Sequence, residues 1–283
     1  MSDVRSCIEE LYLEVFPVAG IEEQLLQLPD GAYLGVTCSP KQGLQQTLDL
    51  VDRLQDRRFH LVPHVAARQV RDRAQLADIV QQFDDQGVKS VFVPGGDIDS
   101  PVGVYDSSLE LLRDLAQIGH RFSDVGVAAY PEGHPDIDGH TLFQSLQAKQ
   151  SLATYMVTQM CFDAAAITRW LEIMRELGIS LPVSIGLPGV MDRLKLFRTS
   201  MRIGVGQSAK FLRRQGGLAS TLLRSSCYQP DDLVQALSGP IGNPAMGIDG
   251  FYLFSFNQVE ATVNWQQACL RKMSEKPEPA VAS

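Results

Sequence analysis

Residues 33–65, which read YLGVTCSPKQGLQQTLDLVDRLQDRRFHLVPHV, decide the fold. Two short apolar runs, Tyr33–Cys38 and His60–Val65, flank a segment in which Leu44 and Leu48 recur at helical spacing. Neither run alternates strictly between polar and apolar residues, which is typical of strands buried on both faces of a parallel sheet. The stretch therefore predicts a strand, a helix and a second strand that runs parallel to the first.

The same rhythm continues on both sides of this stretch. Six further runs of similar composition are predicted as strands: Leu11–Phe16, Ser90–Val93, Val125–Tyr130, Thr154–Phe162, Pro182–Leu187 and Phe251–Phe256. Helical spacing recurs between them, in Arg71–Gln86, Ser107–Ile118, Ile167–Leu177 and Val259–Met273. Gly87, Gly119 and Gly178 follow three of these helices, where a residue that tolerates positive φ is favoured. Eight strands alternating with helices predict an α/β fold, the (β/α)8 TIM barrel.

The length and the first strand support the same fold. The 283 residues suit one barrel of roughly 250 residues, which we place at residues 1–275 as a single domain, followed by a flexible Pro- and Ala-rich tail at 276–283. A doubly wound open sheet is the alternative, and it usually has a glycine-rich loop directly after the first strand. The first strand here ends in Glu14-Val15-Phe16-Pro17 without such a loop, which favours the barrel.

The composition excludes several classes of protein. Hydrophobic residues make up 45% and charged residues 20%, as in an ordinary globular protein, and the formal net charge is −8. An acidic chain argues against a nucleic-acid partner, and no apolar run is long enough to predict a membrane span. The N-terminus lacks the apolar core of a signal peptide, and the five cysteines form no C-x-x-C pair. We therefore expect a reduced, cytoplasmic protein.

The charge is distributed unevenly along the chain. Between Arg193 and Arg224 the sequence holds eight Lys and Arg residues and no Asp or Glu, although the whole chain holds 33 acidic residues. A basic segment on an acidic protein indicates a local site for an anion. A solvated helix face without a partner is the alternative.

Polar residues fall where a (β/α)8 barrel carries its reactive groups, at the ends of the strands. Glu14 lies inside the apolar run LYLEVFP, where burial would raise its pKa toward the range of a general acid, unless it forms a salt bridge. Asp97 follows two glycines after the fourth strand, and it either contacts a ligand or caps the next helix. His64 and His134 are weaker candidates for binding. Metal-ligand spacing of His, Cys, Asp and Glu does not occur, so we expect no metal site.

Motifs in chain order resemble those of the methylenetetrahydrofolate reductase family. The most distinctive is AAYPEGHP at residues 128–135, which is close to the family's A-A-Y-P-E-x-H-P. Other matches are Glu14–Pro17 with E-F-F-P, Pro63-His64 with P-H-L-T-C, Gly96-Asp97 with the end of L-R-G-D, Thr158–Asp163 with T-Q-F-F-F-D, Gly186–Pro188 with G-I-L-P and Phe251–Asn257 with F-H-F-Y-T-L-N. These matches run from residue 14 to about residue 258 and fall on the predicted strands.

The resemblance implies a barrel that holds FAD and interconverts 5,10-methylenetetrahydrofolate and 5-methyltetrahydrofolate with NADH or NADPH. It also implies a homo-oligomer. Glu14 would be the general acid that helps to open the methylene bridge, and Asp97 would lie near the flavin and the pterin. Gln159, Phe197 and Gln258 would contact the folate or the nicotinamide. The flavin or its phosphates would be held by Thr37, His64, Asp97, Tyr130, His134 and Lys149.

The chain departs from the family around the cofactor. Gly95 stands where the family has Arg, Cys38 replaces an aromatic residue, and Gln258 replaces another Arg. Leu142 or Phe143 falls where the family has an acidic residue. Three alternatives therefore stay open: direct hydride transfer from NADH to folate, a flavin-free folate-binding protein without turnover, and a catabolic enzyme that oxidises methyltetrahydrofolate. A barrel enzyme for an unrelated phosphorylated substrate is disfavoured by the order of the motifs.

Overall fold

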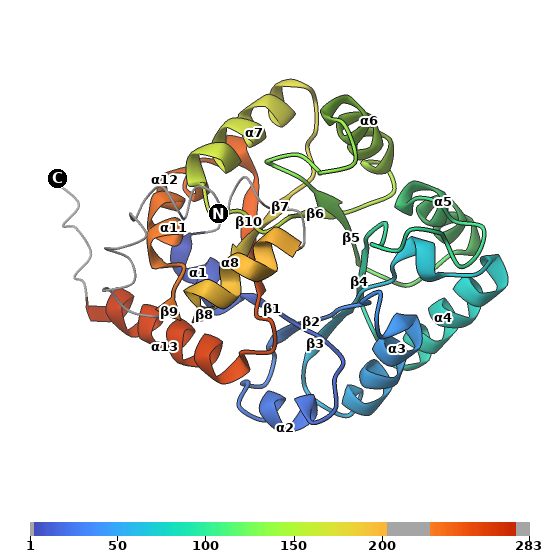
Figure 1. Ribbon diagram of the computed structural model, residues 1–283, viewed down its shortest axis with the longest axis horizontal. Coiled ribbons are helices and arrows are strands. Elements are labelled where there is room, and N and C mark those ends of the chain that lie inside the picture. Colours follow the sequence, from blue (N-terminus) through green and yellow to red (C-terminus); the bar gives the residue numbers. More distant parts are fainter. Residues whose placement is uncertain (1–2, 203–226, 276–283) are drawn as a thin grey trace.

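The computed structural model describes residues 3–202 and 227–275, and its central feature is a parallel sheet of eight strands (Figure 1). The strands are β1 Tyr12–Val15, β2 Tyr33–Val36, β3 His60–Pro63, β4 Ser90–Val93, β5 Asp124–Ala129, β6 Tyr155–Thr158, β7 Val183–Pro188 and β10 Ile248–Phe254. They pair in the order β3-β2-β1-β10-β7-β6-β5-β4. Each of the eight predicted strands is found, and the predicted (β/α)8 barrel is confirmed.

A short seam between β3 and β4 brings the two ends of the strand order together. His64 and Phe92 form a parallel bridge, and the Val65 N–H donates to the Phe92 carbonyl oxygen at 2.8 Å. The Ala67 N–H extends the seam by donating to the Pro94 carbonyl oxygen at 3.0 Å. Because the first and last strands of this order lie side by side, the sheet is a barrel and not a doubly wound open sheet.

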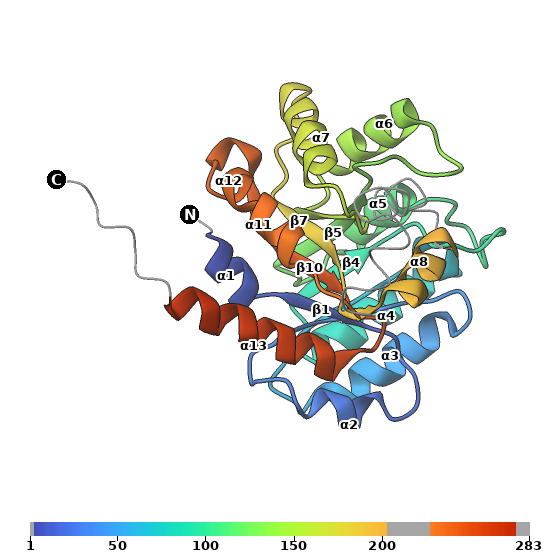
Figure 2. The ribbon, with the colours of Figure 1, turned by 60° about the vertical axis from the view of Figure 1, so that its left-hand side comes forward.

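Helices surround the sheet on its outer face (Figures 1 and 2). They are α1 Val4–Glu9, α2 Ile21–Leu25, α3 Gly43–Leu54, α4 Arg73–Asp85, α5 Ser108–Ile118, α6 Gly139–Lys149, α7 Ala164–Glu176, α11 Asp231–Ala236, α12 Ser238–Ile241 and α13 Val259–Glu275, with 3-10 turns η1 Ala67–Gln69 and η2 Pro244–Met246. The glycines predicted to end three helices have φ values of 70° at Gly87, 80° at Gly119 and 86° at Gly178.

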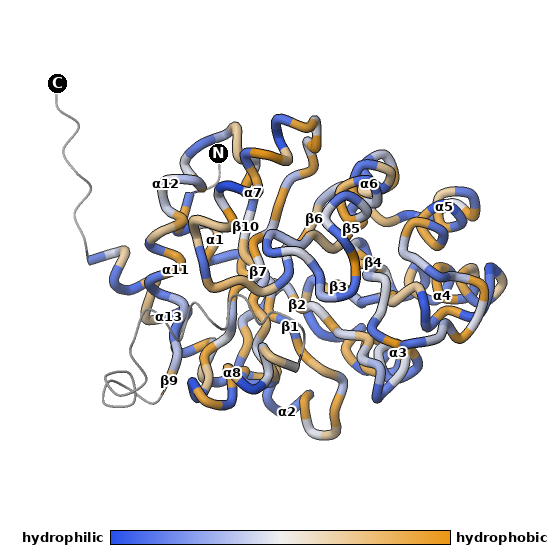
Figure 3. Tube along the Cα trace, turned by 45° about the horizontal axis from the view of Figure 1, so that its top comes forward, coloured by the Kyte–Doolittle hydropathy of each residue, from blue (hydrophilic) through white to orange (hydrophobic). Residues whose placement is uncertain are grey.

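The helices form because their apolar residues share one face. In α4 the residues Leu76, Ile79, Val80 and Phe83 are buried, and Figure 3 shows apolar and polar colours alternating along this helix. The sequence prediction omitted α6, and the reason is visible in its buried face, which consists of Leu146 together with a lysine. A helix with so short an apolar stripe gives little periodic signal.

The core has an outer and an inner part. The larger part lies between the sheet and the helices, and a smaller group inside the barrel consists of Val62, Phe92, Val157 and Tyr252. These four side chains come from four different strands and fill the barrel axis below its carboxyl-terminal rim. The inner group therefore forms the floor of any cavity at that rim.

The segment between β7 and β10 adds a second small sheet. Strands β8 Met191–Asp192 and β9 Cys227–Tyr228 pair in antiparallel fashion, and helix α8 Arg193–Arg202 follows β8. The first part of the predicted basic segment thus falls on α8. The remainder of that segment, at 203–226, and the predicted tail at 276–283 lie outside the described residues.

Candidate active site

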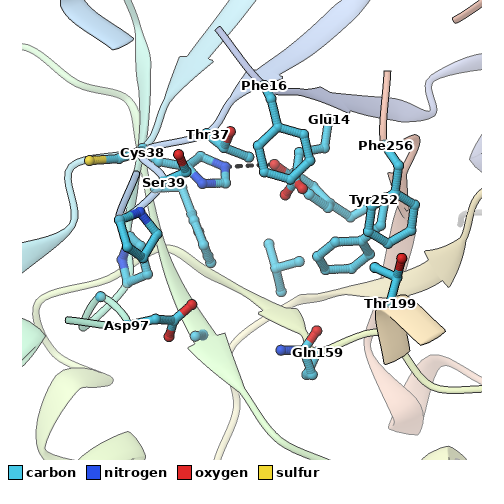
Figure 4. Close-up of a pocket in the computed structure, with 18 of the residues that line it drawn as sticks. Glu14, Phe16, Thr37, Cys38, Ser39, Asp97, Gln159, Thr199, Tyr252 and Phe256 are labelled. Carbon is cyan, nitrogen blue, oxygen red and sulfur yellow. Dashed lines mark hydrogen bonds between the residues drawn. The ribbon is translucent and has the colours of Figure 1, made fainter. Parts of the chain in front are cut away.

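A cavity of about 700 Å³ opens at the carboxyl ends of the strands (Figure 4). Its lining comes from the ends of β1 to β6 and β10 and from α8. The volume lies in the range of sites for small organic ligands, and the location is the one at which barrel enzymes carry their active sites. Seven of the predicted site residues line it: Glu14, Thr37, His64, Asp97, Tyr130, His134 and Gln159.

Glu14 lies on β1 at the floor of the cavity. The side chain is buried, with 6% of the residue exposed, and burial raises the pKa of its carboxyl group to about 8. The loss of hydration is the main cause, because burial disfavours the charged form. A hydrogen bond from the Tyr252 hydroxyl lowers this pKa in part. Near neutral pH the carboxyl group is thus largely protonated and can donate a proton.

Tyr252 reaches Glu14 from β10 through space left by a glycine. A side chain at Gly35, which is the β2 residue paired with Glu14, would overlap the Tyr252 hydroxyl group. Because Gly35 has no Cβ, the tyrosine ring can extend across the barrel from β10. Figure 4 shows its hydroxyl group close to the Glu14 carboxyl group. Sequence reasoning missed Tyr252, although a phenol inside the apolar run FYLFSF was a signal for it.

His64 lies on the other side of the same hydroxyl group. Its Nε2 atom is 2.7 Å from the Tyr252 oxygen, and the dashed line in Figure 4 marks this bond. Burial lowers the pKa of the imidazole to about 3, so the ring is neutral. Thr37, another predicted site residue, is buried and donates from Oγ1 to the Val15 carbonyl oxygen at 3.1 Å.

Asp97, Tyr130 and His134 line the part of the cavity formed by the loops after β4 and β5. Asp97 is exposed, and the rings of Tyr130 and His134 meet edge to face with centroids 5.3 Å apart. The Asp136 N–H donates to Nδ1 of His134 at 3.2 Å. A neutral His134 ring then carries its proton on Nε2, which makes Nε2 a donor.

The side chain of Gln159, just after β6, is oriented by a hydrogen bond to the backbone of the next residue. Its side-chain Oε1 accepts from the Met160 N–H at 2.8 Å, which leaves the amide NH₂ group as a donor. The preceding residue, Thr158, is fully buried, and its Oγ1 accepts from the Gly186 N–H on β7 at 2.8 Å. These two bonds place the end of β6 in the wall of the cavity.

An aromatic wall that the sequence did not predict covers the β10 side of the cavity. It consists of Phe16, Phe254 and Phe256, and flat ligand rings pack well against such a surface. Phe256 and Asn257 have positive φ values of 49° and 60°, a conformation that costs non-glycine residues on the order of 1–3 kcal/mol. Asn257 offsets part of this strain, because its side chain accepts from the Phe16 N–H at 2.8 Å and donates to the Phe16 carbonyl oxygen at 3.1 Å.

Three predicted site residues do not line the cavity. Lys149 is buried on α6, and burial lowers the pKa of its ammonium group to about 8. Phe197 is half-buried on α8, and Gln258 follows the aromatic wall just before α13. Lys41 and Lys195 supply cations to the lining; Lys195 belongs to the basic segment predicted as an anion site, whereas Lys41 was not singled out.

No group of three or more His, Cys, Asp or Glu side chains in 3–202 and 227–275 is arranged to hold a metal ion. No helix in the described part of the chain is long and apolar enough to cross a membrane.

Known proteins resemble this chain in sequence and in fold. The sequence model for methylenetetrahydrofolate reductase matches residues 25–203. A Pectobacterium carotovorum 5,10-methylenetetrahydrofolate reductase is 24% identical over 180 residues, which cover 61% of this chain and 59% of the relative. A Caenorhabditis elegans protein named "Probable methylenetetrahydrofolate reductase (NADPH)" is 25% identical over 126 residues, which cover 42% of this chain and 19% of the relative. The chain thus spans less than two thirds of either relative.

One solved structure supports the fold alone. The structure of an oxaloacetate acetylhydrolase with the inhibitor 3,3-difluorooxalacetate superposes with a TM-score of 0.52 at 10% identity, and it covers 95% of this chain and 83% of that chain.

Proposed function

Because the chain belongs to the methylenetetrahydrofolate reductase family, we propose that it interconverts 5,10-methylenetetrahydrofolate and 5-methyltetrahydrofolate, with NADH or NADPH as the hydride donor. The observation that carries this proposal is Glu14, a carboxyl group at the cavity floor with its pKa raised to about 8. The reduction needs a proton as well as a hydride, and a carboxyl group that is protonated near neutral pH supplies it.

The proton and the hydride act at different atoms of the folate. Glu14 donates its proton to the nitrogen that leaves the methylene bridge, and the carbon–nitrogen bond breaks to give an iminium group. The hydride then adds to the methylene carbon of that group, and the methyl product forms. In the oxidative direction the same steps run backwards, and Glu14 accepts the proton.

The remaining lining suits the two ring systems that have to meet. Asp97 and the amide donor of Gln159 offer polar partners to the edge of a pterin, and Phe16, Phe254 and Phe256 offer flat apolar surfaces to its face. Lys41 and Lys195 line the same cavity and offer cations to the carboxylates of a folate tail or to the phosphates of a nicotinamide nucleotide.

The FAD that the family resemblance implies has poor partners for its diphosphate. Gly95 occupies the place of the family's Arg, and a side chain built there would meet nothing within 4 Å. Lys149 lies outside the lining. The guanidinium group of Arg68 already donates to the carbonyl oxygens of Ile98, Asp99 and Asp106. The described residues thus do not fit the diphosphate of FAD at that place.

We therefore propose that the hydride passes directly from the nicotinamide to the folate within one ternary complex, without FAD. The second candidate, transfer through bound FAD, is favoured by Thr37, Tyr130 and His134, which line the cavity at positions that match flavin contacts in the family. A catalytically inactive folate-binding protein is disfavoured, because a buried carboxyl group is costly to keep without a chemical use.

Two measurements on the purified full chain test the proposal. Initial rates at varied NADH and methylenetetrahydrofolate concentrations should give intersecting, sequential patterns, and the protein should lack the visible absorbance of a flavin. Parallel, ping-pong patterns with a yellow protein would establish the FAD route instead. Absence of turnover with NADH and with NADPH would refute the proposed activity. The homo-oligomer implied by the family stays a prediction, which light scattering of the same preparation checks.

A further inference from the structure

The cavity floor contains a chain of three buried polar groups from three strands. Glu14 comes from β1, Tyr252 from β10, and His64 follows directly after β3. The Tyr252 hydroxyl group bonds to the carboxyl group of Glu14 and lies 2.7 Å from Nε2 of His64. All three residues are at least nine-tenths buried, and Glu14, His64 and Tyr252 also line the cavity.

We propose that Tyr252 and His64 form a proton relay that restores the proton of Glu14 after each reduction. This inference rests on the proposed function, in which Glu14 loses one proton to the folate in every turnover. The substrate then covers the side of the carboxyl group that faces the cavity. Tyr252 lies on another side of that group, and His64, which also lines the cavity, lies beyond Tyr252 in the chain of bonds.

The three proton transfers of the relay leave His64 and Tyr252 uncharged at the end, so no charged form of either residue accumulates. When Glu14 is ionised, the Tyr252 O–H donates to the carboxylate, and Nε2–H of His64 donates to the Tyr252 oxygen. A proton from cavity water binds Nδ1 of His64, the Nε2 proton moves to Tyr252, and the Tyr252 proton moves to Glu14. The products are a neutral carboxyl group, an intact phenol and a neutral histidine that carries its proton on Nδ1, and proton exchange of the imidazole with cavity water returns it to the Nε2–H form before the next turnover. In the oxidative direction the three transfers reverse.

The surroundings keep the relay free of competing charges. The other titratable groups that act on Tyr252 are Tyr12 on β1 and Tyr155 on β6, and burial raises the pKa of both phenols, so they stay uncharged. The imidazole is neutral because burial lowers the pKa of His64. A neutral imidazole has one donor and one acceptor nitrogen, and it can exchange these roles during proton transfer.

His64→Gln is the sharpest test, because glutamine can still bond to Tyr252 but cannot pass a proton through its amide. In a rapid-mixing experiment the first turnover of enzyme with protonated Glu14 should stay within about twofold of the wild type. The steady-state kcat should fall by about tenfold or more, in the range of general acid–base contributions. Tyr252→Phe should likewise leave the first-turnover rate within about twofold of the wild type and lower the steady-state kcat by about tenfold or more. Equal losses in both rates would mean that these residues have a structural role, and unchanged kcat would overturn the relay.

Tyr155→Phe is the matched control. Tyr155 is a partly buried tyrosine that packs against the inner core of the barrel, and its buried hydroxyl group has no hydrogen-bond partner among the described residues. Loss of that hydroxyl should leave both rates at the wild-type level. If this variant also kept its first-turnover rate but lost steady-state kcat, the effect would follow from loss of any phenol in the barrel interior, and the relay would be contradicted.

A measurement without turnover separates the relay from the proposed activity. With 5-methyltetrahydrofolate bound over Glu14 and no nicotinamide nucleotide present, a rapid pH drop is applied, and infrared absorbance of the Glu14 carboxyl group reports the rate at which it gains a proton. The Glu14→Gln protein identifies the band. His64→Gln and Tyr252→Phe should slow this rate by about tenfold or more relative to wild type. If wild type shows no folate turnover, the proposed function fails and this rate alone decides the relay. Equal rates in all three proteins would overturn it.

Discussion

A carboxyl group in the middle of an apolar strand acquires its chemistry from the place where the strand ends. Glu14 pairs with Gly35 on one side and Phe254 on the other, and its side chain lines the cavity in the barrel interior. Burial there raises its pKa, whereas the bond from Tyr252 limits the rise. On the outer face of the sheet, the same carboxyl group would be buried among apolar side chains of the larger core without a polar partner, which would destabilise the fold. One position in a strand therefore sets both the pKa of the acid and its access to a ligand.

Glu14→Gln should abolish folate turnover while leaving the nicotinamide nucleotide bound, because the amide has a similar shape and no acidic proton. In the wild type, the rate of the reduction should fall as pH rises through about 8, since only the protonated carboxyl group is active. Steady-state rates from pH 6 to 10 and NADH binding by fluorescence measure both effects. Retained folate turnover in the variant would show that another group is the acid.

The same substitution should change how stability depends on pH. The pKa of Glu14 is higher in the folded protein, about 8, than the ordinary value of 4.5. The stabilising contribution of the neutral carboxyl group is thus fully present below pH 4.5 and is lost as pH rises through 8. Glu14→Gln should remove this loss, so its free energy of unfolding relative to wild type should increase from pH 5 to pH 9. Urea titrations at both pH values measure it, and a constant difference would contradict the assignment.

At the scale of elements, the cavity wall depends on how β6 and β7 are joined at their upper ends. Their ladder contains two pairs, Met156 with Val183 and Val157 with Ser184. Beyond these pairs, the side-chain oxygen of Thr158 accepts from the Gly186 N–H in the way that a backbone carbonyl would. Gly186 itself allows close approach, because a side chain there would overlap the Thr158 carbonyl oxygen.

Thr158→Val should lower the free energy of unfolding by about 1–3 kcal/mol, because it leaves the buried Gly186 N–H without its acceptor while keeping the side-chain shape. Urea unfolding followed by circular dichroism measures this loss. The matched control is Thr168→Val on α7, where the hydroxyl donates to the Ala164 carbonyl oxygen within the same helix. The control should change stability by at most about 0.5 kcal/mol. Equal losses of stability in both variants would show that the bond between Thr158 and the Gly186 N–H contributes no more than an ordinary hydroxyl group within a helix.

At the scale of the whole molecule, the proposed function requires one cavity to bind two ligands, and the charge of the protein around that cavity is not strongly positive. The chain carries a formal charge of −8, and the cations in the cavity lining are Lys41 and Lys195 among the residues that the structure describes. The family's phosphate-binding Arg is replaced by Gly95, and Lys149 lies elsewhere. The described lining therefore holds no cation at the place where the family's Arg would meet FAD, and Lys41 and Lys195 remain for the anionic groups of a nicotinamide nucleotide or a folate tail.

The increase in the free energy of unfolding caused by each ligand tests whether the barrel binds NADH and folate but not FAD. NADH and 5-methyltetrahydrofolate, each at about 100 times its dissociation constant, should each raise the free energy of unfolding by about 2.7 kcal/mol, because they bind only the folded barrel. FAD at the same concentration as NADH should give no increase. Thermal and urea unfolding with each ligand measure these shifts. An increase with FAD that exceeds the increase with NADH would favour the flavin route.

The sequence by itself determined the repeat of strands and helices, the glycines at helix ends and the carboxyl group in the first strand. Such features are local, because strand and helix periodicities and the need for positive φ are expressed within a few residues. The ordered motifs also indicated seven residues that share the cavity.

Only the tertiary structure decided which distant groups meet. Tyr252 and His64 are 188 positions apart in the chain, and their bond requires the strand register that places Gly35 beside the phenol. The aromatic wall depends on two residues with positive φ that local sequence does not favour. Lys149, which stays a predicted cofactor contact, is buried on α6 and is not part of the cavity lining. Contacts between strands depend on register, twist and side-chain size together, and no short stretch of sequence contains all three.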